Sequence, residues 1–111
     1  MAMQEKQLGQ LRPANTTAAS LYSPGASTTA VIKSIIVCNQ SAAAAKFRIF
    51  VDNDGTTYDQ TTAHYYDISI GATTTLQIDT FWAMNDATGN LAVRTDTNDA
   101  LTFTAYGAEI T

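Results

Sequence analysis

The chain has 111 residues, of which 45% are hydrophobic and only 14% are charged, and its formal net charge is -4. This length suits one domain that buries about two-thirds of its unfolded surface without needing disulfides. An acidic balance argues against direct binding to the phosphate backbone of nucleic acids. No segment has the apolar character of a signal peptide or the length of a membrane span, so we expect a soluble protein with no membrane partner.

The N-terminal part contains two short pieces with strand character. The first covers residues 7 to 12 and ends at Pro13, and the second covers residues 18 to 22 and ends at Ser-Pro-Gly. Either piece suits a strand or an extended arm. We expect residues 1 to 17 to form an N-terminal arm or edge segment, and residues 18 to 111 to form the folded domain.

The segment TAVIKSIIVC, residues 29 to 38, carries the clearest strand pattern. A strict alternation puts Val31, Ile35 and Val37 on one face and places Ile32, Ile36 and Cys38 on the other. A strand that is apolar on both faces needs two covers. We expect the domain core on one side and a terminal segment or a neighbouring subunit on the other.

The next stretch predicts a loop followed by a strand and a turn. The alanine run at 42 to 45 is too short to stand alone as a helix, so it is interpreted as a loop. Residues 46 to 51 alternate, with Phe47, Ile49 and Val51 on one face. The Asp-Gly pair at 54 and 55 predicts a turn, and a polar loop follows to about residue 62.

The C-terminal half predicts four more strands. Residues 63 to 70 place Tyr66, Ile68 and Ile70 on one face, and residues 73 to 81 offer Leu76 and Ile78 to a core. The segment WAMNDATG, residues 82 to 89, is interpreted as a loop that could hold a helical turn. Residues 90 to 95 and 100 to 109 complete the strands, with a turn at Asn98-Asp99.

These elements predict an all-β fold. Seven or eight strands spaced by about ten residues, with no convincing amphipathic helix, are typical of an antiparallel β-sandwich of jelly-roll-like architecture. We expect an extended N-terminal arm in addition to the sandwich.

The sequence offers little for catalysis, metals or cofactors. His64 is the one candidate base, and its place in a strand beside Tyr65 and Tyr66 favours a surface or interface role over a catalytic one. Cys38 stands in an apolar strand, which favours a buried, unreactive thiol. The Asp-Asn-Asp-Gly run at 52 to 55 resembles the opening of a calcium loop, but it lacks the later glutamate and is interpreted as a turn. We therefore predict no catalytic, cofactor-binding or metal-binding residues.

Aromatic and apolar residues on the strands are candidates for protein contacts. A carbohydrate platform could instead be formed by the aromatic residues Tyr65, Tyr66, Phe81, Trp82 and Tyr106, but aromatic residues dominate cores and subunit interfaces. The residues predicted to lie in a protein interface are Leu8, Leu11, Tyr65, Trp82 and Tyr106.

Several strings in a fixed order resemble small structural proteins of tailed bacteriophages. They are the entry SLYSPG, the strands SIIVCN and AKFRIF, the segment HYYDISI, and the ending FTAYGAEI, and the resemblance as a whole covers residues 8 to 111. The resemblance implies a β-sandwich component of the virion and names no catalytic residue.

This resemblance implies a function in assembly. We expect a non-enzymatic virion protein, made in the host cytoplasm, that decorates or cements the assembled capsid. Its partners would be the major capsid protein or other virion proteins, and it would form a homo-oligomer, for example a trimer. A neck or tail-fibre attachment protein and a carbohydrate-binding sandwich are the alternatives.

Overall fold

The computed structural model describes residues 2 to 85 and 87 to 111, apart from the side chain of Asn85. Within this part the chain forms strands and loops without a helix. The strands are β1 (Met3–Leu11), β2 (Ala19–Tyr22), β3 (Thr29–Asn39), β4 (Ala45–Asp52), β5 (Ala63–Ile70), β6 (Thr75–Asn85), β7 (Asn90–Thr95) and β8 (Leu101–Ile110).

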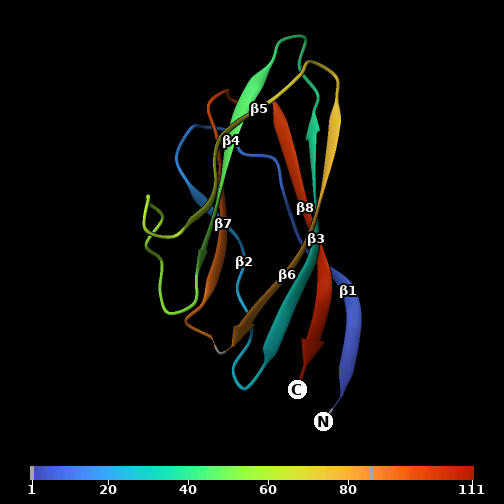
Figure 1. Cartoon of the computed structure of the whole chain (residues 1–111), viewed down its shortest axis with the longest axis vertical. Coiled ribbons are helices and arrows are strands. Elements are labelled where there is room, and N and C mark those ends of the chain that lie inside the picture. Colours follow the sequence, from blue (N-terminus) through green and yellow to red (C-terminus); the bar gives the residue numbers. More distant parts are fainter. Residues whose placement is uncertain (1, 86) are drawn as a thin grey trace.

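The strands form two antiparallel four-stranded sheets that pack face to face (Figure 1). Their orders are β1-β8-β3-β6 and β2-β7-β4-β5. Every neighbouring pair within a sheet is antiparallel. The pairs β1-β8, β2-β7, β3-β6 and β4-β5 make one long hairpin, with its tip between β4 and β5, that winds into two layers. This is the jelly-roll order, so the predicted sandwich is confirmed.

The core lies between the two sheets and is continuous. Its largest fully buried side chains include Phe47, Ile49 and Phe103, and Phe47 meets Phe103 edge to face at 6.0 Å between ring centroids. Leu76 and Ile78 of β6 also pack into or against it. The core faces predicted for β4 and β6 are therefore confirmed.

The outer face of β4 has its own cover. Phe50 points away from the main core, yet it is 1% exposed. The loop between β4 and β5 folds over it, with the Tyr58 ring 6.2 Å from the Phe50 ring between centroids. An apolar residue on the second face of this strand is thus covered by a loop of the same chain.

The predicted faces of β3 are wrong because the strand contains a bulge. Its pairing with β8 shifts between Ile32 and Ser34, so Lys33 is an extra residue. The buried residues on either side of it are Ile32 and Ile35, three positions apart instead of two or four. A bulge adds one residue without a partner and reverses the alternation beyond it.

The expected burial of Cys38 is also wrong, because the outer face of β3 is not fully covered at this position. Val37 faces the core and is fully buried, whereas Cys38 lies on the outer face of the β1-β8-β3-β6 sheet and is partly exposed. The expectation of a buried thiol does not hold at this position.

A second bulge corrects the faces of β5. Asp67 has a positive φ of 55°, and the pairing of β4 with β5 shifts between Phe47 and Ile49. Tyr66 therefore points outward, while Tyr65 contacts the core and Ile70 is buried. The prediction that Tyr66 and Ile70 share a face is wrong.

The expected loop at residues 82 to 89 begins later than predicted. β6 continues through Trp82 to Asn85 and pairs with Thr29 to Ile32 of β3. Asp86 lies outside the described residues. The apolar residues Trp82 and Met84 are two positions apart and both pack toward the core, and this period of two is the signal that favours a strand.

The N-terminal segment forms an edge strand in the isolated chain. β1 pairs with β8 from Met3 to Leu11, and the pairing continues into two backbone hydrogen bonds between Ala2 and Thr111. The described ends of the chain consequently lie side by side (Figure 1).

Candidate functional site

The structure distributes the five predicted interface residues over three places. Tyr65 and Trp82 meet at the open side of the sandwich, between the edge strands β5 and β6. Leu8 and Leu11 lie on the edge strand β1, and Tyr106 lies on the outer face of β8.

Aromatic rings fill the gap between the edges of β5 and β6. The Trp82 ring lies 6.0 Å from Tyr65 and 4.8 Å from His64 between centroids, the latter edge to face. Tyr65 and Trp82 also pack against the main core. His64 is exposed, and its Nδ1 lies 3.3 Å from the Thr62 carbonyl oxygen. This cluster joins the sheets at their open side and leaves aromatic edges at the surface.

Leu8 and Leu11 are partly buried against the core of their own chain. Leu8 is the extra residue where the pairing of β1 with β8 shifts between Gln7 and Gly9. Gly9 lies so close to β2 that a Cβ atom there would be 2.3 Å from the Leu21 carbonyl oxygen. The β1 edge of one sheet is therefore closed tightly against the other sheet.

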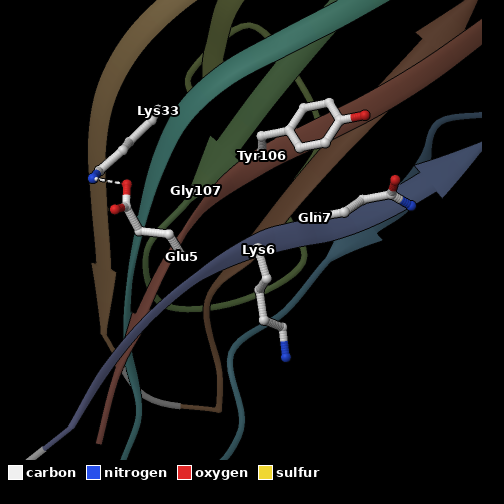
Figure 2. A pocket seen from close by; sticks show the side chains of 6 residues that line it. All are labelled: Glu5, Lys6, Gln7, Lys33, Tyr106 and Gly107. Atoms are coloured by element: carbon white, nitrogen blue, oxygen red, sulfur yellow. Dashed lines mark hydrogen bonds and ion pairs between the residues drawn. The ribbon is translucent and has the colours of Figure 1, made fainter.

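Tyr106 stands beside a shallow hollow on the outer face of the β1-β8-β3-β6 sheet. The hollow measures about 500 Å³ and is lined by Glu5, Lys6, Gln7, Lys33, Tyr106 and Gly107 (Figure 2). Glu5 and Lys33 form an ion pair of 2.7 Å across it. Bonding to Lys33 holds the pKa of the Glu5 carboxyl below its ordinary value.

The hollow forms where bulges align across the sheet. Register shifts occur at Leu8 on β1 and Lys33 on β3, and again on β6 between Asp79 and Trp82. Between them runs Gly107, where a Cβ atom would be 2.0 Å from the Val31 carbonyl oxygen. Bulges bend strands and increase their twist. The bend hollows the surface while the backbone stays tightly packed beneath it.

A polar cluster joins the two sheets near the chain ends. Glu109 of β8 accepts a 2.5 Å hydrogen bond from the Tyr22 hydroxyl of β2 and pairs with Lys6 of β1 at 2.9 Å. These two partners hold the pKa of the Glu109 carboxyl below its ordinary value. Burial raises the pKa of the Tyr22 hydroxyl above its ordinary value, and the hydrogen bond to Glu109 raises it further. Figure 2 shows Lys6 extending away from the Glu5–Lys33 pair.

The outer face of β5 carries a separate charged cluster. Arg48 donates two hydrogen bonds to the Asp67 carboxylate, at 2.7 and 3.1 Å, and its guanidinium lies 3.9 Å from the Tyr66 ring centroid. The bond from Arg48 lowers the pKa of Asp67. This arrangement fixes the bulge at Asp67 and masks part of the Tyr66 ring.

Two further residues lie outside the set predicted for the interface: Phe81, which the sequence offered only as one of several aromatic candidates, and Asn39, whose structural role was missed. Phe81 is 76% exposed; it alternates with Trp82, which faces the core, so it points outward from β6. Asn39 is 1% exposed, and its side-chain amide donates to the carbonyl groups of Ala43, Ile70 and Gly71. Asn39 begins an Asn-Gln-Ser glycosylation pattern, but its buried amide ties the loop after β3 to the loop after β5.

The polar turn at residues 52 to 55 uses its carboxylates on its own backbone. Asp52 accepts hydrogen bonds from the backbone amides of Asp54 and Thr57, which lower the pKa of its carboxyl. Among the described residues no group of three or more His, Cys, Asp or Glu side chains is arranged to hold a metal ion. No described helix is long and apolar enough to cross a membrane.

Comparison with known proteins gives the fold. No family model matches the chain, and no curated protein sequence matches it. One solved structure with a similar fold is the crystal structure of the T13 viral particle of IBDV. It shares 14% identity at a TM-score of 0.55 and covers 96% of this chain and 30% of that chain.

Two further structures of infectious bursal disease virus are more distant. The Gx strain gives a TM-score of 0.49 at 12% identity, covering 97% of this chain and 30% of that chain. The VP2 subviral particle gives a TM-score of 0.44 at 13% identity, covering 97% of this chain and 29% of that chain. This chain thus spans about 30% of the length of the chains it resembles. The chain shares its jelly-roll fold with part of the protein in the T13 particle.

Proposed function

We propose that this protein is a non-enzymatic structural component of a virus particle that binds the assembled shell as a decoration or cement protein of a tailed phage. The observation that carries the proposal is the eight-stranded jelly roll, which matches part of a virus-particle chain over 96% of its own length. The phage assignment rests on the sequence resemblance described above, and the partner would be the major capsid protein or another virion protein.

The outer face of the β1-β8-β3-β6 sheet supports binding to a protein surface. Met3, Phe81 and Tyr106 are exposed by 64%, 76% and 42%. Phe81 points outward because Trp82 points inward, and Met3 shares its face of β1 with Glu5, which lines the hollow. The charges of Glu5 and Lys33, which line the hollow on this face, neutralise each other in an ion pair. Exposed aromatic rings around a neutral, hollowed centre are typical of protein contact surfaces.

The N-terminal segment, residues 1 to 17, would contribute to the same attachment. β1 occupies the edge of this sheet, and its residues from Met3 to Gln7 are exposed. An exposed edge segment can reach a neighbouring subunit or the shell beneath. Repeated copies on a particle multiply the effect of each such contact.

The test is co-sedimentation with particles that lack the protein. Tyr106→Lys places a cation in the middle of the proposed surface, and we expect about a tenfold loss of occupancy at limiting concentration, equivalent to about 1.4 kcal/mol. Gln60→Lys adds the same charge in the loop between β4 and β5, on the other sheet, and should bind as the wild type does. Equal occupancy of all three proteins would contradict the proposed surface.

Failure of the wild-type protein to sediment with such particles would contradict shell binding itself. Tail, neck and fibre preparations from the same phage serve as parallel targets, and binding to one of them alone would favour the attachment-protein alternative. A glycan array probes the carbohydrate alternative, for which loss of binding in Tyr106→Lys would place the sugar at the hollow.

A further inference from the structure

The sandwich has four strands at its sheet edges, and they differ in how they are protected. An edge strand presents unpaired backbone donors and acceptors, and proteins block such edges with charges, bulges or short strands. β2 has only four residues. β1 carries Glu5 and Lys6 and a bulge at Leu8. β5 carries a bulge at Asp67, where φ is positive.

The first half of β6 lacks these protections. From Thr75 to Asp79 it pairs with β3 in a regular register, Cys38↔Thr75 through Ser34↔Asp79, and its other edge faces no strand among the described residues. Asp79 is the single charged residue in this run. Five residues extend about 17 Å, the length of an ordinary strand. The irregular pairing near Phe81 ends this regular stretch.

The run Thr-Leu-Gln-Ile-Asp is complementary to itself. In an antiparallel pair with Gln77 opposite Gln77 of a second copy, Leu76 faces Ile78 and Thr75 faces Asp79, each twice. Leu76 and Ile78 are on the core face, while Thr75, Gln77 and Asp79 are exposed. Directly opposed residues in a ladder share a face, so this register joins apolar to apolar and polar to polar side chains.

Charge also permits this register. The two Asp79 carboxylates would be offset by four residues, about 13 Å along the strands, which exceeds the screening length of about 8 Å at physiological ionic strength. Each would face a Thr75 hydroxyl. Two alternative registers are poorer: a pair centred on Asp79 opposes two carboxylates, and a pair centred on Phe81 falls on the irregular stretch.

The neighbouring side chains favour the same partner. Leu76 is only partly buried, and Ile68 on the adjacent edge of β5 is 36% exposed. A second copy placed against β6 would shield apolar atoms at this open side of the sandwich. A two-fold axis makes the contact use the same patch on both copies, which is the usual form of a dimer interface.

From these observations we propose that two copies of this chain associate through β6, in the register that places Gln77 on the two-fold axis. The two β1-β8-β3-β6 sheets then become one continuous eight-stranded sheet. This contact is independent of shell binding, because it is formed by the edge of the sheet and needs no other virion protein.

Cysteine crosslinking tests the register directly. In a Cys38→Ser background, Gln77→Cys places two thiols on directly opposed residues, whose Cα atoms lie about 4.5 to 5.5 Å apart, within disulfide reach. We expect rapid formation of a covalent dimer under mild oxidation. Thr75→Cys or Asp79→Cys alone should not crosslink, whereas an equimolar mixture of the two should.

A charge introduced at the two-fold axis tests the contact without cysteine. Gln77→Lys opposes two ammonium groups, so we expect the dimer dissociation constant to rise at least about tenfold in analytical ultracentrifugation, since directly opposed like charges destabilise strand pairs. Gln60→Lys is the control for added charge and should dimerise as the wild type does. Equal melting temperatures at a concentration where both variants are monomeric would show that both are folded.

A wild-type protein that stays monomeric at all concentrations, or crosslinking of Thr75→Cys alone as fast as Gln77→Cys, would overturn this proposal. Neither result bears on the shell-binding proposal, whose readout is co-sedimentation with particles. A monomeric Gln77→Lys protein that still binds particles would support both proposals and show that the two surfaces are separate.

Discussion

The two long sides of the sandwich are closed by different means. On the side of β1 and β2, the backbone of Gly9 approaches Leu21, and Tyr22 reaches across to the Glu109 carboxylate. On the side of β5 and β6, the rings of Tyr65 and Trp82 fill the gap. Backbone approach and short polar bonds leave little for a partner to cover, whereas aromatic rings leave apolar edges in water. The gap between the sheets therefore leaves more apolar surface for a second copy to shield on the side of β5 and β6 than on the side of β1 and β2.

The closed side should be intolerant of any added atom at Gly9. In Gly9→Ala the new Cβ would lie 2.3 Å from a backbone oxygen, so β1 or β2 must move, and we expect the free energy of unfolding to fall by roughly 1 to 3 kcal/mol. Urea denaturation measures it. Gly25→Ala is the matched control, because its Cβ would meet nothing closer than 3.7 Å. Equal losses in both variants would show that the two sides are not closed differently.

The stability of the open side should depend on the Trp82 side chain and should change little when the Phe81 side chain is removed. Removal of a fully buried large aromatic residue costs about 3 to 5 kcal/mol, and since Trp82 is only partly buried we expect Trp82→Ala to cost about 2 kcal/mol. Phe81→Ala, at a position 76% exposed, should cost less than about 0.5 kcal/mol. Denaturant unfolding at a concentration where the protein is monomeric separates the two. Similar values would mean that Trp82 does not join the sheets.

The smallest effect concerns the pH dependence of the closed side. The pKa of Glu109 lies below its ordinary value of 4.5, so its contribution to stability is present above that pH and is lost as the pH falls through the lowered pKa. The pKa of Tyr22 is raised above 10, so its contribution is present below pH 10 and is lost as the pH rises through the raised value.

Glu109→Gln isolates this contribution from that of the other carboxyl groups. We expect the variant to be less stable than the wild type by about 1 kcal/mol at pH 7, the usual size for a hydrogen bond of this kind, and the difference to shrink toward pH 3. Melting temperatures across this range measure it. A difference that stays constant with pH would contradict the assigned role of the Glu109 carboxylate.

The sequence by itself determined the fold class and the core faces of several strands. Alternating apolar residues at Phe47 and Ile49, and at Leu76 and Ile78, identify strands because the side-chain period of a strand is two. The scarcity of charge indicated a largely neutral surface. Aromatic character led to Tyr65, Trp82 and Tyr106 being predicted as interface residues, although it did not distinguish a core-packed ring from an exposed one.

Only the tertiary structure decided which faces of β3 and β5 are buried and which residues meet. The bulges at Lys33 and Asp67 reverse the alternation, and a bulge depends on the neighbouring strands, which a local pattern does not contain. Asn39 bonds to Ile70 and Gly71, and Tyr22 bonds to Glu109, across separations of 31 to 87 residues. Such pairings follow from the winding of the long hairpin into two layers, because that winding brings distant strands together.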